Sequence, residues 1–356
     1  MTITANNPIG LDGFEFVEFT SPDPARMVEL IEQLGFTAYA KHPTKNLVRY
    51  KQGRINLLVN QETSGQVAEF RAAHGPSANG MAFRVANAKA AYELALSRGA
   101  KAGDASQSAL PDAYVLEGIG GSMLYLVDRF GEAGTIYDAW DQIPGAVEAE
   151  AANSVGLDLL DHLTHNVKRG QMRTWSTFYN QIFGFEEQKY FDIKGQATGL
   201  FSQAMIAPDK AIRIPLNESQ DDRSQIEEFI REYNGEGIQH LAFTTADIYG
   251  TVEKLRARGV KLQDTIETYY ELIDKRVPGH GEDVERLRKN RILLDGAVGD
   301  EGLLLQIFTE NLFGPIFFEI IQRKGNEGFG NGNFQALFES IELDQIRRGV
   351  IKVDAA

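Results

Sequence analysis

The sequence of 356 residues contains no cysteine. This absence excludes disulfide bonds, thiolate metal ligands and thiol nucleophiles. The sequence also has no run of about 18 apolar residues, the length that a membrane-spanning helix needs. Residues 1–10 show no basic segment followed by an apolar one, so no export signal is expected. We therefore expect a cytoplasmic protein without a membrane segment.

Positive charge is scarce as well. The chain has 36 Lys and Arg residues against 50 Asp and Glu residues, a net charge of −14. Nucleic acids and anionic membranes bind clustered basic residues, so neither is expected as a partner. An anionic small molecule is not excluded, because a bound cation can supply the charge that it needs. The hydrophobic content of 43% is typical of a folded protein, and the length predicts two domains.

The sequence is repeated internally. Residues 80–101 (GMAFRVANAKAAYELALSRGAK) resemble residues 240–261 (HLAFTTADIYGTVEKLRARGVK) at an offset of 160. Each segment predicts a short strand and then an amphipathic helix that ends at a glycine. Residues 14–36 and 162–185 form a second pair with the same order, at an offset of 149 where both reach Gly-Phe.

These pairs give four strand–helix units, and each is followed by a strand-like segment, at residues 56–59, 123–127, 212–216 and 303–308. We therefore predict an α+β fold of two homologous halves. The boundary is expected near residues 153–156, which gives domains of residues 1–152 and 153–356. Residues 264–300 have no counterpart of equal length in the first half, and we interpret them as an inserted loop with some helix.

Two histidines and one glutamate are candidate metal ligands. His162 and His240 each open the strand of their unit, and Glu319 lies in an apolar strand, PIFFEIIQ, where a carboxylate is costly to bury. The three residues are 78 and 79 positions apart, so each comes from a different strand. Two imidazoles and one carboxylate without sulfur are typical of an Fe(II) facial triad with open coordination positions. His165 is expected on the opposite face of its strand, away from this group.

Purely structural roles are the alternative for these residues. A histidine at the start of a strand often only makes hydrogen bonds, and Glu319 could point to solvent from an edge strand. The first half serves as an internal control, because it has Phe14, Gly80 and, more loosely, Asp138 in place of the three candidate ligands. Only the second half could therefore bind a metal in this way.

Several motifs of the second half resemble one enzyme family. Residues 317–349 (FFEIIQRKGNEGFGNGNFQALFESIELDQIRRG) are similar to the C-terminal signature of 4-hydroxyphenylpyruvate dioxygenases. Shorter matches occur in the family's order: DHLTHNV, IPLNE, GIQHLAF and LLLQIFT, at residues 161–167, 214–218, 237–243 and 303–309. The first half matches that family's non-catalytic N-terminal domain in architecture only. The resemblance implies the vicinal-oxygen-chelate fold, in which paired βαβββ modules form open barrels.

The resemblance also implies a role for each site residue. One Fe(II) per chain is expected on His162, His240 and Glu319, and no other protein residue is required as a catalytic group. The implied substrate-binding residues are Ser202, Pro215, Asn217, Gln225, Gln239, Gln306, Phe308, Phe329 and Phe334. The glycine-rich residues 328–334 (GFGNGNF) are expected to let a helix at residues 334–348 close over the barrel as a lid against water.

The reaction implied by the resemblance is the conversion of 4-hydroxyphenylpyruvate, an α-keto acid, and O2 to homogentisate and CO2 in tyrosine and phenylalanine catabolism. Two alternatives stay open: a 4-hydroxymandelate synthase, which oxidises the benzylic carbon of the same substrate, and a metal-free binding protein on the same scaffold. Pro215, Asn217 and Phe334 favour ring hydroxylation, because the ring-hydroxylating enzymes have these residue types there. The resemblance also predicts a homo-oligomer, with a tetramer as the guess.

Overall fold

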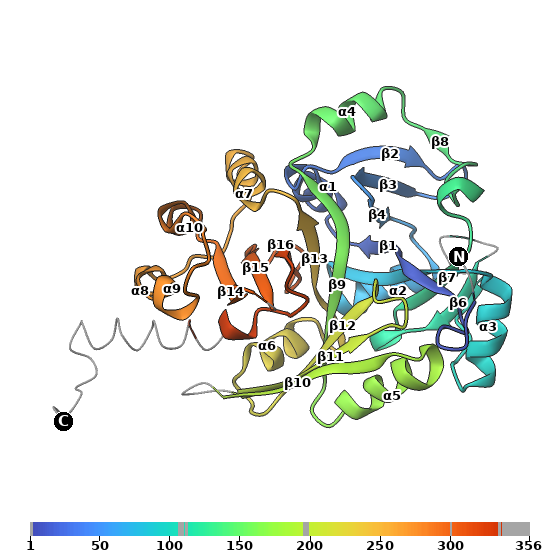
Figure 1. Ribbon diagram of the computed structural model, residues 1–356. Coiled ribbons are helices and arrows are strands. Elements are labelled where there is room, and N and C mark those ends of the chain that lie inside the picture. The colour runs from blue at the N-terminus through green and yellow to red at the C-terminus, as the bar shows by residue number, and fades with distance from the viewer. Residues whose placement is uncertain are drawn as a thin grey trace.

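The chain folds into two curled β-sheets of eight strands each, with helices packed around them (Figure 1). The computed structural model describes residues 3–105, 110, 113–194, 199–299, 301–333 and 336. Within these ranges no helix is long and apolar enough to span a membrane. The predicted α+β class is confirmed.

The first sheet is formed by the first half of the chain. Its strands are β1 (Leu11–Thr20), β2 (Thr37–Lys41), β3 (Leu47–Gln52), β4 (Ile55–Asn60), β5 (Ser77–Val85), β6 (Tyr114–Glu117), β7 (Met123–Val127) and β8 (Asp141–Gln142). They lie in the order β6-β7-β5-β1-β4-β3-β2-β8. β1 is central, antiparallel to β5 and parallel to β4, and β5 runs parallel to β7.

The second sheet repeats this arrangement. Its strands are β9 (Leu157–Val167), β10 (Glu186–Lys194), β11 (Gly199–Ile206), β12 (Arg213–Ser219), β13 (Gly237–Thr245), β14 (Leu293–Ala297), β15 (Gly302–Phe308) and β16 (Phe317–Lys324). They lie in the order β10-β11-β12-β9-β13-β16-β15-β14. β9 takes the place of β1, β13 that of β5 and β16 that of β7, with the same parallel and antiparallel pairings. The predicted duplication is confirmed.

The helices follow the repeat as well. They are α1 (Pro24–Gln33), α2 (Gly65–His74), α3 (Ala88–Ser97), α4 (Ala146–Asn153), α5 (Met172–Phe183), α6 (Gln225–Glu232), α7 (Ile248–Ala257), α8 (Glu267–Glu271), α9 (Ile273–Arg276) and α10 (Val284–Asn290), with short 3-10 helices at Ile119–Gly121 and Gly131–Ala133. Helices α3 and α7 begin and end at the same offset of 160, and each is capped by an acceptor side chain, Asn87 or Asp247. Both end before a glycine with positive φ, 98° at Gly99 and 81° at Gly259.

The insertion is more structured than predicted. Residues 264–300 contain the short helices α8, α9 and α10, and the strand β14, which the sequence did not predict, extends the sheet beyond β15. Just before the insertion, the chain makes a single antiparallel β-bridge between Leu262 and Thr309. The first half has the equivalent bridge between Ala102 and Leu116. In the first half only residues 103–113 lie between the equivalent bridge residue and β6.

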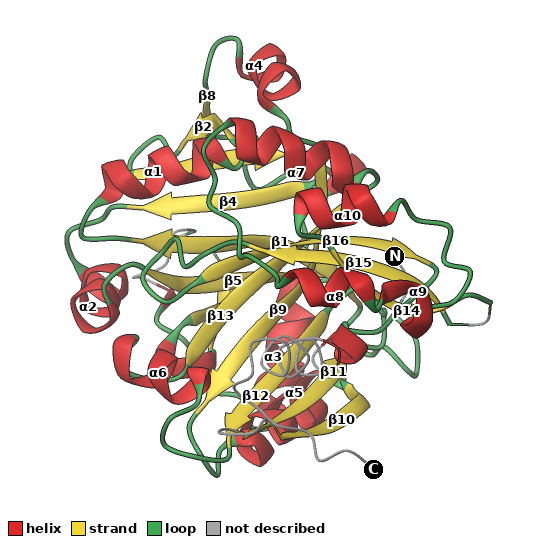
Figure 2. Ribbon diagram, turned by 90° about the vertical axis from the view of Figure 1, so that its left-hand side faces the viewer, coloured by secondary structure: helices red, strands yellow, loops and turns green. Residues whose placement is uncertain are grey.

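The two halves share one core. Rings from both halves meet in it, with centroid distances of 5.6 Å between Phe36 and Phe243 and 5.4 Å between Phe83 and Phe183. Figure 2 shows α1 and α7 side by side along this junction. The predicted boundary falls at the end of α4, just before β9 begins. That the halves are separate domains stays a prediction.

A reciprocal pair of arginines also links the halves. Arg258, which follows α7, donates to the backbone oxygen of Glu32 in α1. Arg98, at the same repeat position after α3, donates to the backbone oxygen of Ile182 in α5. Each arginine thus satisfies a carbonyl in the last turn of a helix in the other half.

Candidate metal centre

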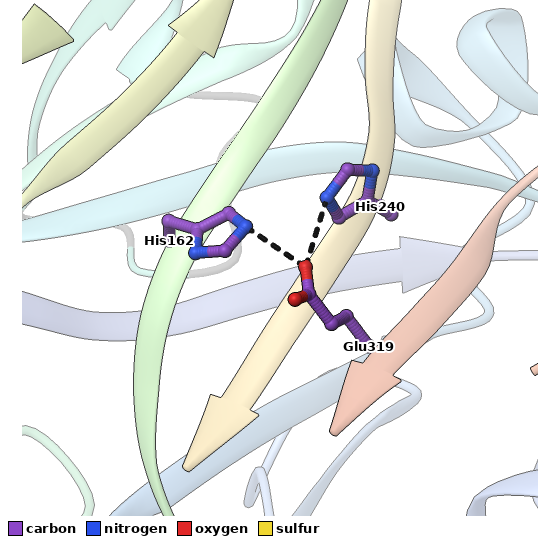
Figure 3. A group of neighbouring side chains, drawn as sticks. All are labelled: His162, His240 and Glu319. Atoms are coloured by element: carbon purple, nitrogen blue, oxygen red, sulfur yellow. Dashed lines mark ion pairs between the residues drawn. The ribbon is translucent and has the colours of Figure 1, made fainter. Parts of the chain in front are cut away.

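Three neighbouring strands bring His162, His240 and Glu319 together (Figure 3). His162 lies on β9, His240 on β13 and Glu319 on β16, and all three are at least nine-tenths buried. Glu319 Oε2 is 3.1 Å from His162 Nε2 and 3.5 Å from His240 Nε2. The predicted convergence is therefore present in the structure. The predicted position of His162 at the start of its strand is wrong, because β9 already begins at Leu157.

Two β-bulges shape the strands beside the histidines. Where β9 pairs with β13, Asp161 and Gln239 have no partner in the register, and one of them stands directly before each histidine. A bulge breaks the alternation of faces, so two consecutive side chains can serve the same site. Asp161 Oδ1 accepts a hydrogen bond of 2.8 Å from His162 Nδ1, and Gln239 Oε1 accepts one of 3.0 Å from His240 Nδ1.

These bonds fix the tautomer of both rings. With Nδ1 donating its proton, Nε2 is the nitrogen that can bind a metal. The hydroxyl of Thr164 lies 3.0 Å from Nε2 of His240 and can donate to it, which agrees with an unprotonated nitrogen there. Both Nε2 atoms point to the same oxygen of Glu319.

Asp161 is itself held by two arginines. Arg323 donates to both of its oxygens at 2.8 Å, and Arg213 Nη1 lies 3.5 Å away. Arg323 also donates to the backbone oxygens of Asn326 and Gly328, which ties the glycine-rich loop to the site. Burial alone would raise the pKa of Asp161, but the bonds from Arg323 and His162 lower it.

The carboxylates set the protonation of the ligands. Burial alone would raise the pKa of Glu319, but the charges and hydrogen bonds of His162 and His240 lower it to about 2. Burial would lower the pKa of His162, and Glu319 and Asp161 outweigh it, so this pKa is raised. Burial lowers the pKa of His240. A cation that binds Nε2 of His162 must therefore displace a proton, so metal affinity should rise with pH.

This donor set fits a divalent cation. The ligand atoms all lie within 4.8 Å of one another, and among the described residues no other group of three His, Asp or Glu side chains does so. Two imidazole nitrogens and one carboxylate oxygen suit iron or a similar first-row ion. His165 lies on the opposite face, where its Nε2 and the Tyr179 hydroxyl are 2.7 Å apart, so the prediction that it points away is confirmed.

A cavity of about 300 Å³ lies against the three ligands. All the predicted substrate-binding residues that the structure describes line it: Ser202, Pro215, Asn217, Gln225, Gln239, Gln306, Phe308 and Phe329. The ring of Phe329 is 5.3 Å from that of His162, and Gln306 Nε2 donates to Glu319 Oε1 at 3.1 Å. Phe334 and the predicted lid helix at residues 334–348 lie outside the described residues, apart from Ala336.

Some lining residues were not predicted. The ring of Phe317 stacks on His240 at 4.7 Å, and Thr164 contacts the same imidazole. Both stand two positions from a ligand in their strand, so simple alternation could have identified them. The insertion and the residue before it supply further lining residues for which the sequence carries no signal: Gln263, Asp264, Thr265, Arg291 and Leu293.

The first half has bulky rings where the second half has ligands. Strand pairing places Phe16 opposite Ala82, as His162 is opposite Ala242, and places Tyr125 beside Ala82, as Glu319 is beside Ala242. The predicted counterparts Phe14 and Asp138 are therefore wrong. The offset of 149 at Gly-Phe falls to 146 at the strand (162 − 16), in part because α5 has 12 residues where α1 has 10. Asp138 lies beyond β7, in a turn where it bonds Thr135.

The third counterpart, Gly80, is confirmed by the same pairing, since it faces Glu18 as His240 faces Thr164. The rings of Phe16 and Tyr125 are 5.1 Å apart, and a Cβ added at Gly80 would lie 3.0 Å from Tyr125. Side chains thus fill the space that the ligands surround in the second half.

Known proteins resemble both halves. A family model described as "Hydroxyphenylpyruvate dioxygenase, HPPD, N-terminal" matches residues 5–141, and one described as "Glyoxalase/Bleomycin resistance protein/Dioxygenase superfamily" matches residues 159–272. A 4-hydroxyphenylpyruvate dioxygenase of Pseudomonas aeruginosa is 60% identical over 98% of each chain. Hemolysin VllY of Vibrio vulnificus is 56% identical over 98% of this chain and 99% of its own.

A solved structure shares the fold as well. A mutant 4-hydroxymandelate synthase from Streptomyces coelicolor superposes with a TM-score of 0.79 at 27% identity, over 94% of this chain and 99% of that chain. The match of residues 5–141 to the N-terminal family model extends to the first half a resemblance that the motifs supported only in the second. With 60% identity over nearly the whole length of both proteins, the chain belongs to the 4-hydroxyphenylpyruvate dioxygenase family.

Proposed function

We propose that the chain is a 4-hydroxyphenylpyruvate dioxygenase that holds one Fe(II) on His162, His240 and Glu319. The observation that carries the proposal is the buried two-histidine, one-carboxylate group beside a cavity of about 300 Å³, within a chain of this family. Bound Fe(II) supplies the site at which an α-keto acid chelates and dioxygen is reduced. In the overall reaction 4-hydroxyphenylpyruvate and O2 give homogentisate and CO2, and both oxygen atoms of O2 enter products.

The charge of the ligands suits an anionic substrate. Two neutral imidazoles and one carboxylate leave a divalent ion with a net positive charge, which attracts a carboxylate in a chain of net charge −14. The pKa of Glu319, lowered to about 2, keeps it ionised at neutral pH. The protein side therefore contributes ligands and a local positive field, and no side chain acts as nucleophile.

The cavity walls offer separate surfaces for the aromatic ring of the substrate and for its phenol hydroxyl. Phe308, Phe317 and Phe329 flank the histidines, and their rings can pack against the aromatic ring of the substrate. Ser202 and Asn217 face each other across β11 and β12, and Gln225 opens α6 on the same wall. We assign these polar groups to the phenol hydroxyl of the substrate, because a buried hydroxyl needs hydrogen-bond partners.

Product identification tests the proposal. The purified protein is incubated with Fe(II), O2 and 4-hydroxyphenylpyruvate, and homogentisate is expected. Formation of 4-hydroxymandelate instead would assign the benzylic reaction and overturn the choice of ring hydroxylation. Pro215 and Asn217 support ring hydroxylation, since both line the cavity as the family resemblance requires.

Ligand variants test the metal assignment. His162→Ala and Glu319→Ala should lose bound iron and substrate-dependent oxygen uptake, because each removes one of only three protein ligands. His42→Ala and Glu310→Ala change the same residue types away from the site and should retain both properties. If both ligand variants kept the iron content and the oxygen uptake of the wild type, the enzyme assignment would fail. The predicted tetramer and cytoplasmic location stay predictions.

A further inference from the structure

A chain of hydrogen bonds connects the insertion to the metal ligand Glu319. Arg276 Nη2 donates to the Tyr269 hydroxyl at 2.7 Å, and this hydroxyl donates to Asn333 Oδ1 at 2.6 Å. Asn333 Nδ2 then donates to Gln306 Oε1 at 2.9 Å, and Gln306 Nε2 donates to Glu319 Oε1 at 3.1 Å. Four of the five side chains are buried, with exposed fractions of 1–3% for Tyr269, Asn333, Gln306 and Glu319.

The direction of every bond in this chain is set at its outer end. A guanidinium can only donate, and the backbone N–H of Leu294 also donates to the Tyr269 hydroxyl at 2.9 Å. That hydroxyl accepts both bonds, so its own proton goes to Asn333 Oδ1 at 2.6 Å, which is nearer than the backbone oxygen of Leu294 at 3.2 Å. Arg276 Nη1 also donates directly to Asn333 Oδ1 at 3.3 Å, in the same direction. Burial raises the pKa of Tyr269 to about 12, so the proton is retained. The amide of Asn333 must then turn its oxygen outward and its nitrogen toward Gln306, and Gln306 repeats this orientation toward Glu319.

The two oxygens of Glu319 consequently have different surroundings. Oε1 accepts from Gln306, whereas Oε2 faces the Nε2 atoms of both histidines at 3.1 and 3.5 Å. Oε1 is thereby held toward Gln306, and Oε2 is the oxygen turned toward both histidines. A carboxylate that binds through one oxygen leaves a coordination position that a two-oxygen carboxylate occupies.

We propose that Tyr269, held by Arg276, is a positioning residue that restricts Glu319 to one metal-binding oxygen and so keeps a coordination position for the α-keto acid. The proposal rests on the proposed function. Tyr269 does not line the cavity, so it acts only through Asn333 and Gln306. Tyr269 and Arg276 lie on α8 and α9, which have no counterpart among the described residues of the first half, and the proposal gives the inserted helices a role in the site.

The test compares Tyr269→Phe with Tyr270→Phe. Both tyrosines are 1% exposed and their rings are 5.1 Å apart, but only Tyr269 belongs to the bond chain. The dissociation constant of 4-hydroxyphenylpyruvate is measured on the Fe(II)-loaded protein without oxygen, so that no turnover occurs. The dissociation constant of Fe(II) and the thermal unfolding midpoint are measured on the same samples.

For Tyr269→Phe we expect the substrate dissociation constant to rise about three- to tenfold, the factor for one lost hydrogen bond of ordinary strength, with Fe(II) affinity unchanged or tighter. Tyr270→Phe should bind substrate like the wild type. Arg276→Gln, whose amide no longer enforces the direction, should change substrate binding in the same sense if Tyr269→Phe does not fold. Wild-type substrate affinity in Tyr269→Phe, or an equal rise in Tyr270→Phe, would overturn the proposal. Absence of Fe(II)-dependent product from the wild type would instead reject the proposed function.

Discussion

Asp161 holds the candidate metal site together without being one of its three candidate ligands. It accepts from His162 Nδ1 and pairs with Arg323 through both oxygens. The sequence shows it directly before His162, but adjacent residues on a regular strand point to opposite faces, so no role could be assigned. The bulge at Asp161 allows both Asp161 and His162 to serve the same site. A bulge is a property of strand pairing that the sequence does not reveal.

Asp161→Asn should weaken Fe(II) binding by about 10- to 100-fold, the usual effect of removing the partner of a metal-bound histidine. An amide carries no charge to pair with Arg323 and orients the imidazole less strongly. A metal titration of the unloaded protein measures the effect. Asp158→Asn is the matched control, because Asp158 lies on the same strand but pairs with the exposed Arg54. Equal affinities in the two variants would contradict the role of Asp161.

His165 should make the protein less stable in acid. Burial lowers its pKa to about 3, whereas the unfolded chain titrates near the ordinary value of 6.5. Between these values the unfolded state binds one more proton than the folded state. The stability that neutral His165 contributes is therefore complete above pH 6.5 and is lost as the pH falls towards 3. The slope for this one group approaches ~1.4 kcal/mol per pH unit.

Denaturant unfolding of wild type and His165→Gln at several pH values measures this slope. Glutamine keeps a polar partner for Tyr179 but does not titrate. The stability difference between the two proteins should therefore shrink as the solution becomes more acidic. Parallel pH profiles would show that His165 does not contribute.

At the scale of elements, the glycine-rich loop after β16 brings backbone against a cavity side chain. Gly330 has φ 75°, and a Cβ there would lie only 1.7 Å from Gln306 Oε1. Gln306 cannot move freely, because Asn333 and Glu319 hold both ends of its amide. The sequence predicted only that this glycine-rich segment allows a helix to close over the barrel, and the structure adds the reason for glycine at this one position.

Gly330→Ala should lower kcat/KM by about 10- to 100-fold, the loss that a displacement of about 1 Å in an active site can cause. Gly279→Ala is the control, because Gly279 has the same φ of 75° with nothing within 4 Å of an added Cβ. Both variants carry the backbone strain of a left-handed alanine, so their comparison isolates the effect of the contact with Gln306. Equal activity in steady-state assays would separate the loop from the site.

Elements with local patterns were predicted well, and those that depend on pairing were not. Helices α3 and α7 have apolar faces, polar caps and terminal glycines within their own residues, so both bounds agree with the repeat. Strand β14 is short and stands among charged segments, and it becomes a strand only by pairing with β15. The predicted first-half counterparts of His162 and Glu319 were wrong for the same reason, since the register between distant strands depends on tertiary structure.

At the scale of the whole molecule, side chains fill the region of the first half that corresponds to the metal-ligand group and cavity of the second half. Phe16 is fully buried and its ring meets Tyr125 in a separate cluster of the first half. The duplication, the three ligands and eight cavity residues could be predicted from the sequence, with the family motifs needed for the cavity. The sequence could not predict that this cluster takes the place of the three candidate ligands, because that equivalence follows only from the strand pairings.

Phe16→Ala should lower the free energy of unfolding by about 3–5 kcal/mol, the usual cost of removing a buried ring. Iron content should stay at one ion per chain with unchanged affinity, because the ligands belong to the other sheet. Denaturant unfolding and metal analysis of the same preparation measure both quantities. A weakened affinity for iron would mean that the packing of the first half supports the second.

The bulges beside the histidines occur in the first half too, at Glu15 and Asn79, where no ligand follows. The bent backbone is therefore an inherited property of the scaffold and not a distortion imposed by an ion. Metal loading then needs no rearrangement of strands, only the exchange of protons for a cation at ready-made side chains. Removal by a chelator should accordingly be reversible without refolding, and hydrogen exchange in β9 and β13 should be the same before and after it.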